Sequence, residues 1–122
     1  MRSFILALLA STALAATAYA SDIVAVTYGN TINVVNAEGA PIVSVWINED
    51  KSWEAHNPDA TVHKGTWTAD DKQICFTRTE PPLEPNEQAP ECHPFAVDHK
   101  VGDTWTEGEG KDLVTITIKE GR

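Results

Sequence analysis

The chain has 122 residues and a formal net charge of −9, with 18 acidic side chains against 9 basic ones. This length suits one domain and is short for two, and the 2 cysteines are too few for a disulfide-dense miniprotein or a four-cysteine zinc ribbon. The excess of acidic residues argues against a nucleic-acid-binding protein, because phosphate binding needs clustered lysine and arginine side chains.

Residues 1–20 have the three-part layout of a secretory signal peptide. A basic residue lies beside the start, an apolar run follows, and Ala18-Tyr19-Ala20 offers a cleavage site. The run is shorter than the roughly 20 apolar residues that a spanning helix needs, so a membrane anchor is the weaker interpretation. We expect a mature domain of residues 21–122, which loses one basic side chain with the signal and carries a net charge of −10. We also expect a periplasmic or secreted location with no membrane span after cleavage.

Short β-prone stretches follow one another along the mature chain, separated by turn residues at intervals of about 8–12 positions. In chain order we expect strands at 22–28, 31–36, 41–47, 52–56, 61–64 continued at 66–68, 73–79, 92–97, 103–106 and 113–119. Gly29-Asn30 is a two-residue hairpin signal between the first two stretches, and Gly65 indicates a bulge. No window has the apolar spacing of a helix. The pattern predicts an all-β domain, a small antiparallel barrel or sandwich of about eight to nine short strands.

Alternating apolar residues indicate which face of this sheet is buried. The expected core consists of Val24, Val26, Val43, Val45, Trp67, Ile74, Phe76, Val114, Ile116 and Ile118. The tryptophans are Trp46, Trp53, Trp67 and Trp105. Such rings line the pocket in a ligand-binding barrel, but in a small domain they more often fill the core, because each ring buries a large area. Both interpretations can hold in a barrel with a small cavity.

Cys75 and Cys92 are expected to form a disulfide in an oxidising compartment. They enclose a proline-rich loop (residues 79–91) that cannot form a strand ladder of its own. Closing the 16 intervening residues contributes about 3 kcal/mol in the chain-entropy model. A redox or metal-binding pair is the alternative, but no C-x-x-C spacing supports it. The sequence leaves open whether the loop is a recognition element or a tolerated insertion.

The turn at Asn57-Pro58-Asp59 suggests a possible metal face. If the hairpin closes symmetrically, His56 pairs with Thr61 and Glu54 pairs with His63. Glu54, His56 and His63 then share one face, and two imidazoles with a carboxylate are able to hold Zn²⁺ or Cu²⁺. The alternative is an ordinary exposed polar face, and a one-residue shift of register would separate the three side chains.

The remaining chemistry-bearing residues give no motif. His93 and His99 have no partner at ligand spacing and are expected to be ordinary surface or loop residues. The chain lacks G-x-S-x-G, H-E-x-x-H and a glycine-rich phosphate loop, so we predict that it is not an enzyme. We expect no cofactor.

Several short motifs carry a resemblance to a known group. They are Tyr28-Gly29-Asn30-Thr31, Gly65-Thr66-Trp67 with Cys75 eight residues after the tryptophan, Cys92, Val101-Gly102-Asp103-Thr104-Trp105 and the terminal Gly121-Arg122. With these motifs, most of the mature chain resembles small, uncharacterised secreted β-rich proteins of Gram-negative bacteria, particularly alphaproteobacteria. The resemblance implies a compartment and a β-rich fold, and it implies no site residue.

Two functions stay open at this point. The first is a secreted or periplasmic non-enzymatic binding or interaction protein that meets a basic protein, because a net charge near −10 would steer a cationic partner. The alternative is a carrier of a small ligand or metal, using the barrel interior or the Glu54, His56 and His63 face. Acidity also serves solubility and protects sheet edges, which requires no partner.

Overall fold

The computed structural model describes residues 23–122, so the predicted signal peptide lies outside the described residues. Eight antiparallel strands form one sheet in the order β6-β5-β4-β3-β2-β1-β8-β7. The strands are β1 (Thr31–Asn36), β2 (Pro41–Ile47), β3 (Ser52–His56), β4 (Val62–Ala69), β5 (Gln73–Glu80), β6 (Glu91–Pro94), β7 (Thr104–Glu107) and β8 (Val114–Lys119). Two short 3-10 helices, η2 (Ala25–Thr27) and η3 (Gly110–Asp112), precede β1 and β8. The predicted all-β domain is confirmed.

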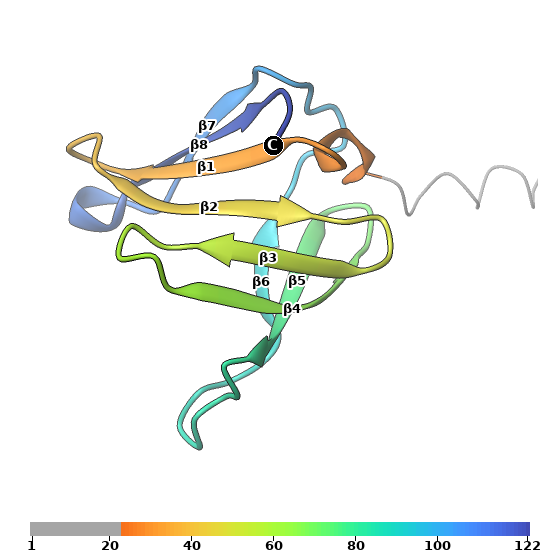
Figure 1. Ribbon diagram of the computed structural model, residues 1–122. Helices are drawn as coiled ribbons and strands as arrows, with labels where there is room; N and C mark the ends of the chain where they lie inside the picture. The colour runs from red at the N-terminus through yellow and green to blue at the C-terminus, as the bar shows by residue number, and fades with distance from the viewer. Residues whose placement is uncertain (1–22) are drawn as a thin grey trace, which may run out of the picture.

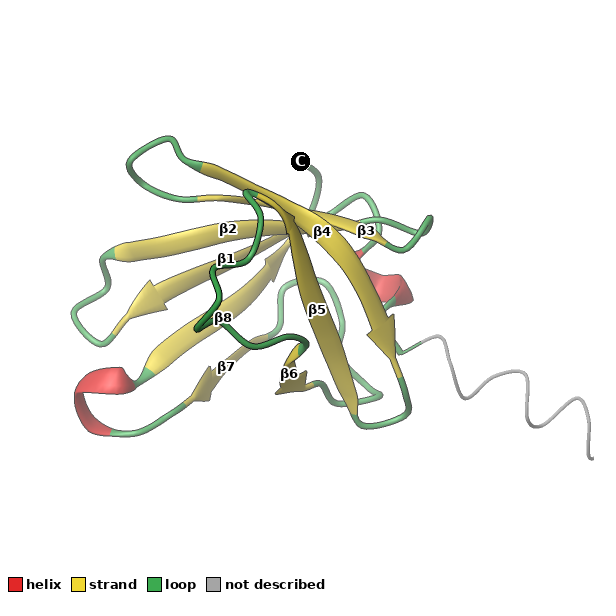
Figure 2. Cartoon of the chain, turned by 90° about the horizontal axis from the view of Figure 1, so that it is seen from below, coloured by secondary structure: helices red, strands yellow, loops and turns green. Residues whose placement is uncertain are grey.

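The sheet curls into a half-barrel (Figures 1 and 2). In Figure 1, β5 and β6 run steeply behind β3 and β4, because the sheet twists and bends along its length. The two edge strands are β6 and β7. The architecture is therefore closer to a barrel than to a sandwich of two sheets.

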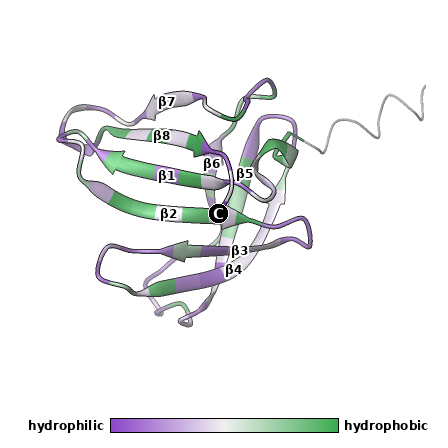
Figure 3. Ribbon diagram, turned by 45° about the horizontal axis from the view of Figure 1, so that its top comes forward, coloured by the Kyte–Doolittle hydropathy of each residue, from purple (hydrophilic) through white to green (hydrophobic). Residues whose placement is uncertain are grey.

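Cross-strand pairs of β-branched residues hold the centre of the sheet together. Ile32 of β1 lies between Val45 of β2 and Ile118 of β8. Hydrophobic residues gather on β1, β2 and β8 (Figure 3). Among the predicted core residues, Val24, Trp67, Ile74, Ile116 and Ile118 are buried, and Val26, Val43, Val45, Phe76 and Val114 are partly buried and pack against them.

The prediction of a strand at 22–28 is wrong, and so is the prediction of a hairpin at Gly29-Asn30. Within the described part of this segment the chain forms η2, and β1 pairs with β2 and β8. The amide N–H and the hydroxyl of Thr27 both donate to the carbonyl of Val24, at 2.9 and 2.6 Å, and close a turn. Ile23, Val24 and Thr27 are buried, so tertiary burial outweighs the β propensity of the segment.

β4 is one strand across the stretches expected at 61–64 and 66–68, and Gly65 lies at the predicted irregularity. The register between β4 and β5 shifts between Lys64 and Gly65. A Cβ at Gly65 would lie 1.9 Å from the backbone oxygen of Thr77, so only glycine permits this close approach. The strand expected at 92–97 ends at Pro94, after which the Phe95 amide donates to the Lys72 carbonyl.

Candidate functional site: a cavity on the concave face

The concave face of the half-barrel forms an open cavity of about 440 Å³. Alternate residues of a strand point to the same face, which places one side chain in two from most strands on the cavity wall. The apolar part of the wall consists of Ile32, Val34, Val43, Val45, Ile47, Trp53, Ala55, Ile74, Phe76, Leu83, Ala89, Pro94, Phe95, Trp105, Val114 and Ile116. The volume and the apolar lining are those of a small-molecule site.

Polar side chains line part of the same cavity. They are Asn57, His63, Arg78, Glu87, Gln88, Glu91, His93 and Glu107. Sequence reasoning did not single out most of them. Alternation places Glu91 with His93, and Trp105 with Glu107, on shared faces of their strands. Nothing in the sequence indicates that β6 and β7 become the two edges of one curled sheet.

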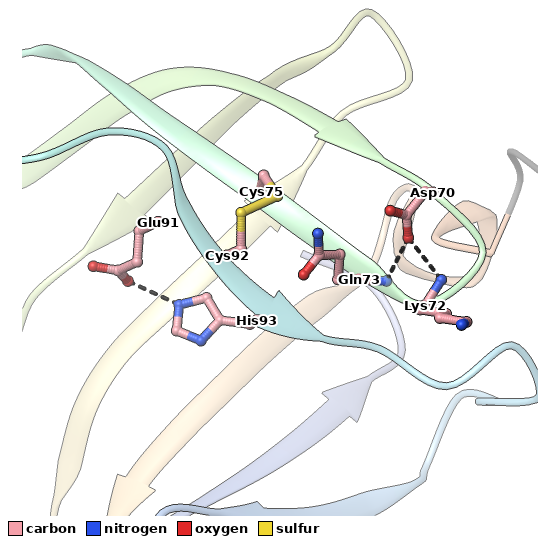
Figure 4. Close-up of a disulfide and its surroundings, with 7 residues drawn as sticks. All are labelled: Asp70, Lys72, Gln73, Cys75, Glu91, Cys92 and His93. Atoms are coloured by element: carbon pink, nitrogen blue, oxygen red, sulfur yellow. Dashed lines mark hydrogen bonds and ion pairs between the residues drawn. A yellow bond between two sulfur atoms is a disulfide. The ribbon is translucent and has the colours of Figure 1, made fainter.

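His93 connects those two edges. Its Nε2 lies 2.8 Å from Oε2 of Glu91, and its Nδ1 lies 3.5 Å from Oε1 of Glu107. Figure 4 shows the contact with Glu91. His93, whose side chain is 42% exposed, thus faces a carboxylate on each edge strand.

The proline-rich loop forms part of the cavity wall and is held by Arg78. The guanidinium donates to both carboxylate oxygens of Glu87, at 2.6 and 3.0 Å, and to the carbonyls of Pro81 and Pro82 at 2.8 and 3.1 Å. This fork-to-fork geometry is the strongest form of an ion pair. The bonds from Arg78, together with one from the Glu84 backbone N–H, hold the pKa of the Glu87 carboxyl below its usual value.

The predicted disulfide between Cys75 and Cys92 is confirmed (Figure 4). The two residues lie directly opposite each other on β5 and β6. The bridge therefore holds an edge strand of only four residues and closes the base of the proline-rich loop. Both elements carry residues of the cavity wall.

Rings also gather where the chain passes from β6 to β7. His99 stacks on Trp105 with ring centroids 3.8 Å apart, and Phe95 meets Trp105 edge-on at 5.9 Å. Asp103 lies 3.3 Å from Nδ1 of His99. Bonds from the Lys100 backbone N–H and from His99 lower the pKa of the Asp103 carboxyl. His99, which was expected to be a surface or loop residue, lies in the loop between β6 and β7 and packs between rings and a carboxylate.

The predicted metal face is wrong by one residue of register. Ala55 lies opposite His63, and His56 lies opposite Val62. The reason is the turn, in which Asn57 bonds to Thr61 and Ala60 adopts a left-handed φ of 73°. This is a three-residue hairpin loop rather than the symmetric closure assumed.

The three candidate ligands consequently separate. Glu54 and His56 stay on the convex face, whereas His63 lines the cavity. The hydrogen bond from His56 to Glu54, at 2.5 Å, lowers the pKa of the Glu54 carboxyl. Within residues 23–122 no group of three or more His, Cys, Asp or Glu side chains has the geometry to hold a metal ion.

The four tryptophans divide between the core, the cavity and the convex face. Trp67 is buried and donates from its indole N–H to the Asn48 carbonyl at 2.9 Å. Trp53 and Trp105 line the cavity. Trp46 bonds to the Thr31 hydroxyl, away from the cavity wall.

Comparison with known proteins gives no match to a family model, to a curated protein or to a solved structure. The similarity to small secreted bacterial proteins therefore stays a prediction. In the described part of the chain, no helix has the length and apolar character needed to cross a membrane.

Proposed function

We propose that this is a non-enzymatic binding protein of the periplasm or the extracellular space that takes a small, largely apolar ligand into the half-barrel. The observation that carries the proposal is the cavity of about 440 Å³ with its largely apolar wall. A cavity of this size leaves apolar surface of a small domain in contact with water. A bound apolar molecule would cover that surface and stabilise the folded protein. The disulfide supports an oxidising compartment.

The construction of the walls supports the same function. Most of the apolar lining lies on regular strands, which position a site more accurately than loops do. The proline-rich loop contributes Leu83, Gln88 and Ala89 to the wall, and the clamp between Arg78 and Glu87 holds it there. The loop therefore has a role as part of the site.

A series of straight-chain 1-alkanols tests the proposal, with binding measured by calorimetry or by quenching of Trp53 and Trp105. Each added CH₂ that enters the cavity contributes about 0.8 kcal/mol, so the affinity should rise about fourfold per carbon until the cavity is full. Absence of saturable binding along the whole series would refute the proposal.

A pair of valine substitutions provides the matched control. Val43 lines the cavity, whereas Val62 lies on the other face of the sheet and is partly exposed. Val43→Phe places a ring in the cavity and should weaken binding at least about tenfold, while Val62→Phe should leave it unchanged. Equal effects of the two substitutions would place the ligand outside the cavity.

A partner protein of basic character is the second candidate. The proline-rich loop projects from the sheet (Figure 1), and its Leu83, Glu84 and Ala89 side chains are exposed. Together with the net negative charge, an exposed acidic loop would favour a cationic surface. Binding of such a partner should weaken steeply with salt, and salt-independent binding would exclude the steering argument.

A further inference from the structure

Negative charges outnumber positive charges on the cavity wall. Three carboxylates, Glu87, Glu91 and Glu107, line the cavity together with a single guanidinium, Arg78. That guanidinium already donates to both oxygens of Glu87 and to two backbone carbonyls. Its charge is therefore neutralised within the protein, and it leaves Glu91 and Glu107 without an arginine or lysine partner on the wall.

One imidazole serves both of these carboxylates. His93 contacts Glu91 through Nε2 and Glu107 through Nδ1. A neutral imidazole carries one N–H and can donate to only one of them, which leaves the site with two negative charges. Even a doubly protonated His93 leaves one negative charge in excess.

Glu107 is the carboxylate with the weaker contacts. Its Oε1 lies 3.5 Å from His93, and its Oε2 lies 3.4 Å from the indole N–H of Trp105. Both distances exceed the usual length of a hydrogen bond to oxygen. Its side chain is 21% exposed, so the charge is only partly hydrated. A carboxylate in this state is a strong acceptor for an N–H donor that enters the cavity.

We propose that the ligand is an amphiphilic cation, with an apolar body against the strands and an ammonium or guanidinium head against the carboxylate of Glu107. This inference rests on the proposed binding function and specifies the chemical class of its ligand. A carboxylate head, as in a fatty acid, would instead meet two carboxylates of its own sign. An uncharged hydroxyl head can donate one hydrogen bond to Glu107, but it leaves the excess negative charge unbalanced.

Three ligands with the same ten-carbon chain test the inference: decylamine, 1-decanol and decanoate. Each is titrated at pH 7 and below its micelle concentration, with calorimetric readout. We expect decylamine to bind about tenfold more tightly than 1-decanol, decanoate to bind most weakly, and only the charged ligands to respond to salt.

The substitution Glu107→Gln should remove most of the advantage of decylamine and leave the affinity for 1-decanol unchanged. Glu109→Gln is the matched control, because Glu109 is exposed, close in sequence and not part of the cavity wall. Unchanged 1-decanol binding shows that the Glu107→Gln cavity is intact.

The outcomes separate the two proposals. If none of the three ligands binds, the proposed binding function fails. If all three bind with equal affinity, the cavity is a binding site and the inferred head group is wrong. If decanoate binds most tightly, the head is anionic and the inference is overturned. If both Gln variants reduce decylamine binding equally, the overall negative charge acts rather than Glu107.

Discussion

Removal of the Cys75–Cys92 bridge should weaken the fold by a predictable amount. The two cysteines are 17 residues apart, and in the chain-entropy model a closed loop of that length contributes about 3 kcal/mol by restricting the unfolded chain. The double substitution Cys75→Ser and Cys92→Ser should therefore lower the free energy of unfolding by about 3 kcal/mol. The Tm should fall by roughly 12–24 °C for a domain of this size.

Urea unfolding of the oxidised protein and of the double variant measures this difference directly. The variant should also show a larger m value, because its unfolded chain is less compact. A loss of less than about 1 kcal/mol would refute loop closure as the source of the bridge's contribution. Wild-type protein with a reduced disulfide is the control, and it should match the double variant.

Further substitutions test the close contacts and the clamp. Gly65→Ala should destabilise the protein by about 3 kcal/mol or more in urea unfolding, because the new Cβ meets the β5 backbone. Gly39→Ala, where nothing lies within 4 Å but φ is 83°, should cost only about 1 kcal/mol. Similar losses would contradict the close approach. Arg78→Gln and Glu87→Gln should speed amide hydrogen exchange in the proline-rich loop, whereas Glu84→Gln should not, and equal exchange in all three would exclude the clamp. Because folding lowers the pKa of Glu87, the clamp is fully formed above the ordinary carboxyl pKa, and as pH falls through the lowered value the wild-type loop should come to exchange like Glu87→Gln. A loop that stays equally protected at low pH would exclude this linkage.

Strand positions were predicted well where alternation and turn residues agree. The ranges of β1, β2 and β3 match the sequence-based expectation at both ends. β1 and β2 consist largely of β-branched residues, β3 alternates apolar with polar residues, and a turn containing Gly, Asn or Asp follows each strand. The local β propensity and the tertiary burial of these segments favour the same structure, so the sequence alone predicts them correctly.

Prediction failed where a tertiary contact decides the local structure. Ile23 to Tyr28 has the composition of a strand, but burial of Val24 and Thr27 favours a turn. The prediction of the hairpin after β3 failed by a single residue, because the left-handed Ala60 allows a three-residue loop (58–60) in place of the expected four-residue loop (57–60). That one residue moves His63 from the convex face into the cavity, as the two-residue period of a strand requires.

The polar part of the site was beyond sequence reasoning for a topological reason. Glu91 and His93 lie on one edge strand and Glu107 on the other. These strands are not hydrogen-bonded neighbours, so no hairpin signal connects them. Only the curl of the sheet brings the imidazole to within 3.5 Å of the Glu107 carboxylate.

Methyl NMR during titration with decylamine tests the central claim most directly. The methyl groups of Val34, Val43 and Ile116 line the cavity, whereas Ile42 and Val62 are exposed outside it. The account predicts saturable shift changes at the three cavity residues and none at the two exterior residues. Changes confined to the exterior methyls, or no saturable change at any of them, would contradict a ligand site within the half-barrel.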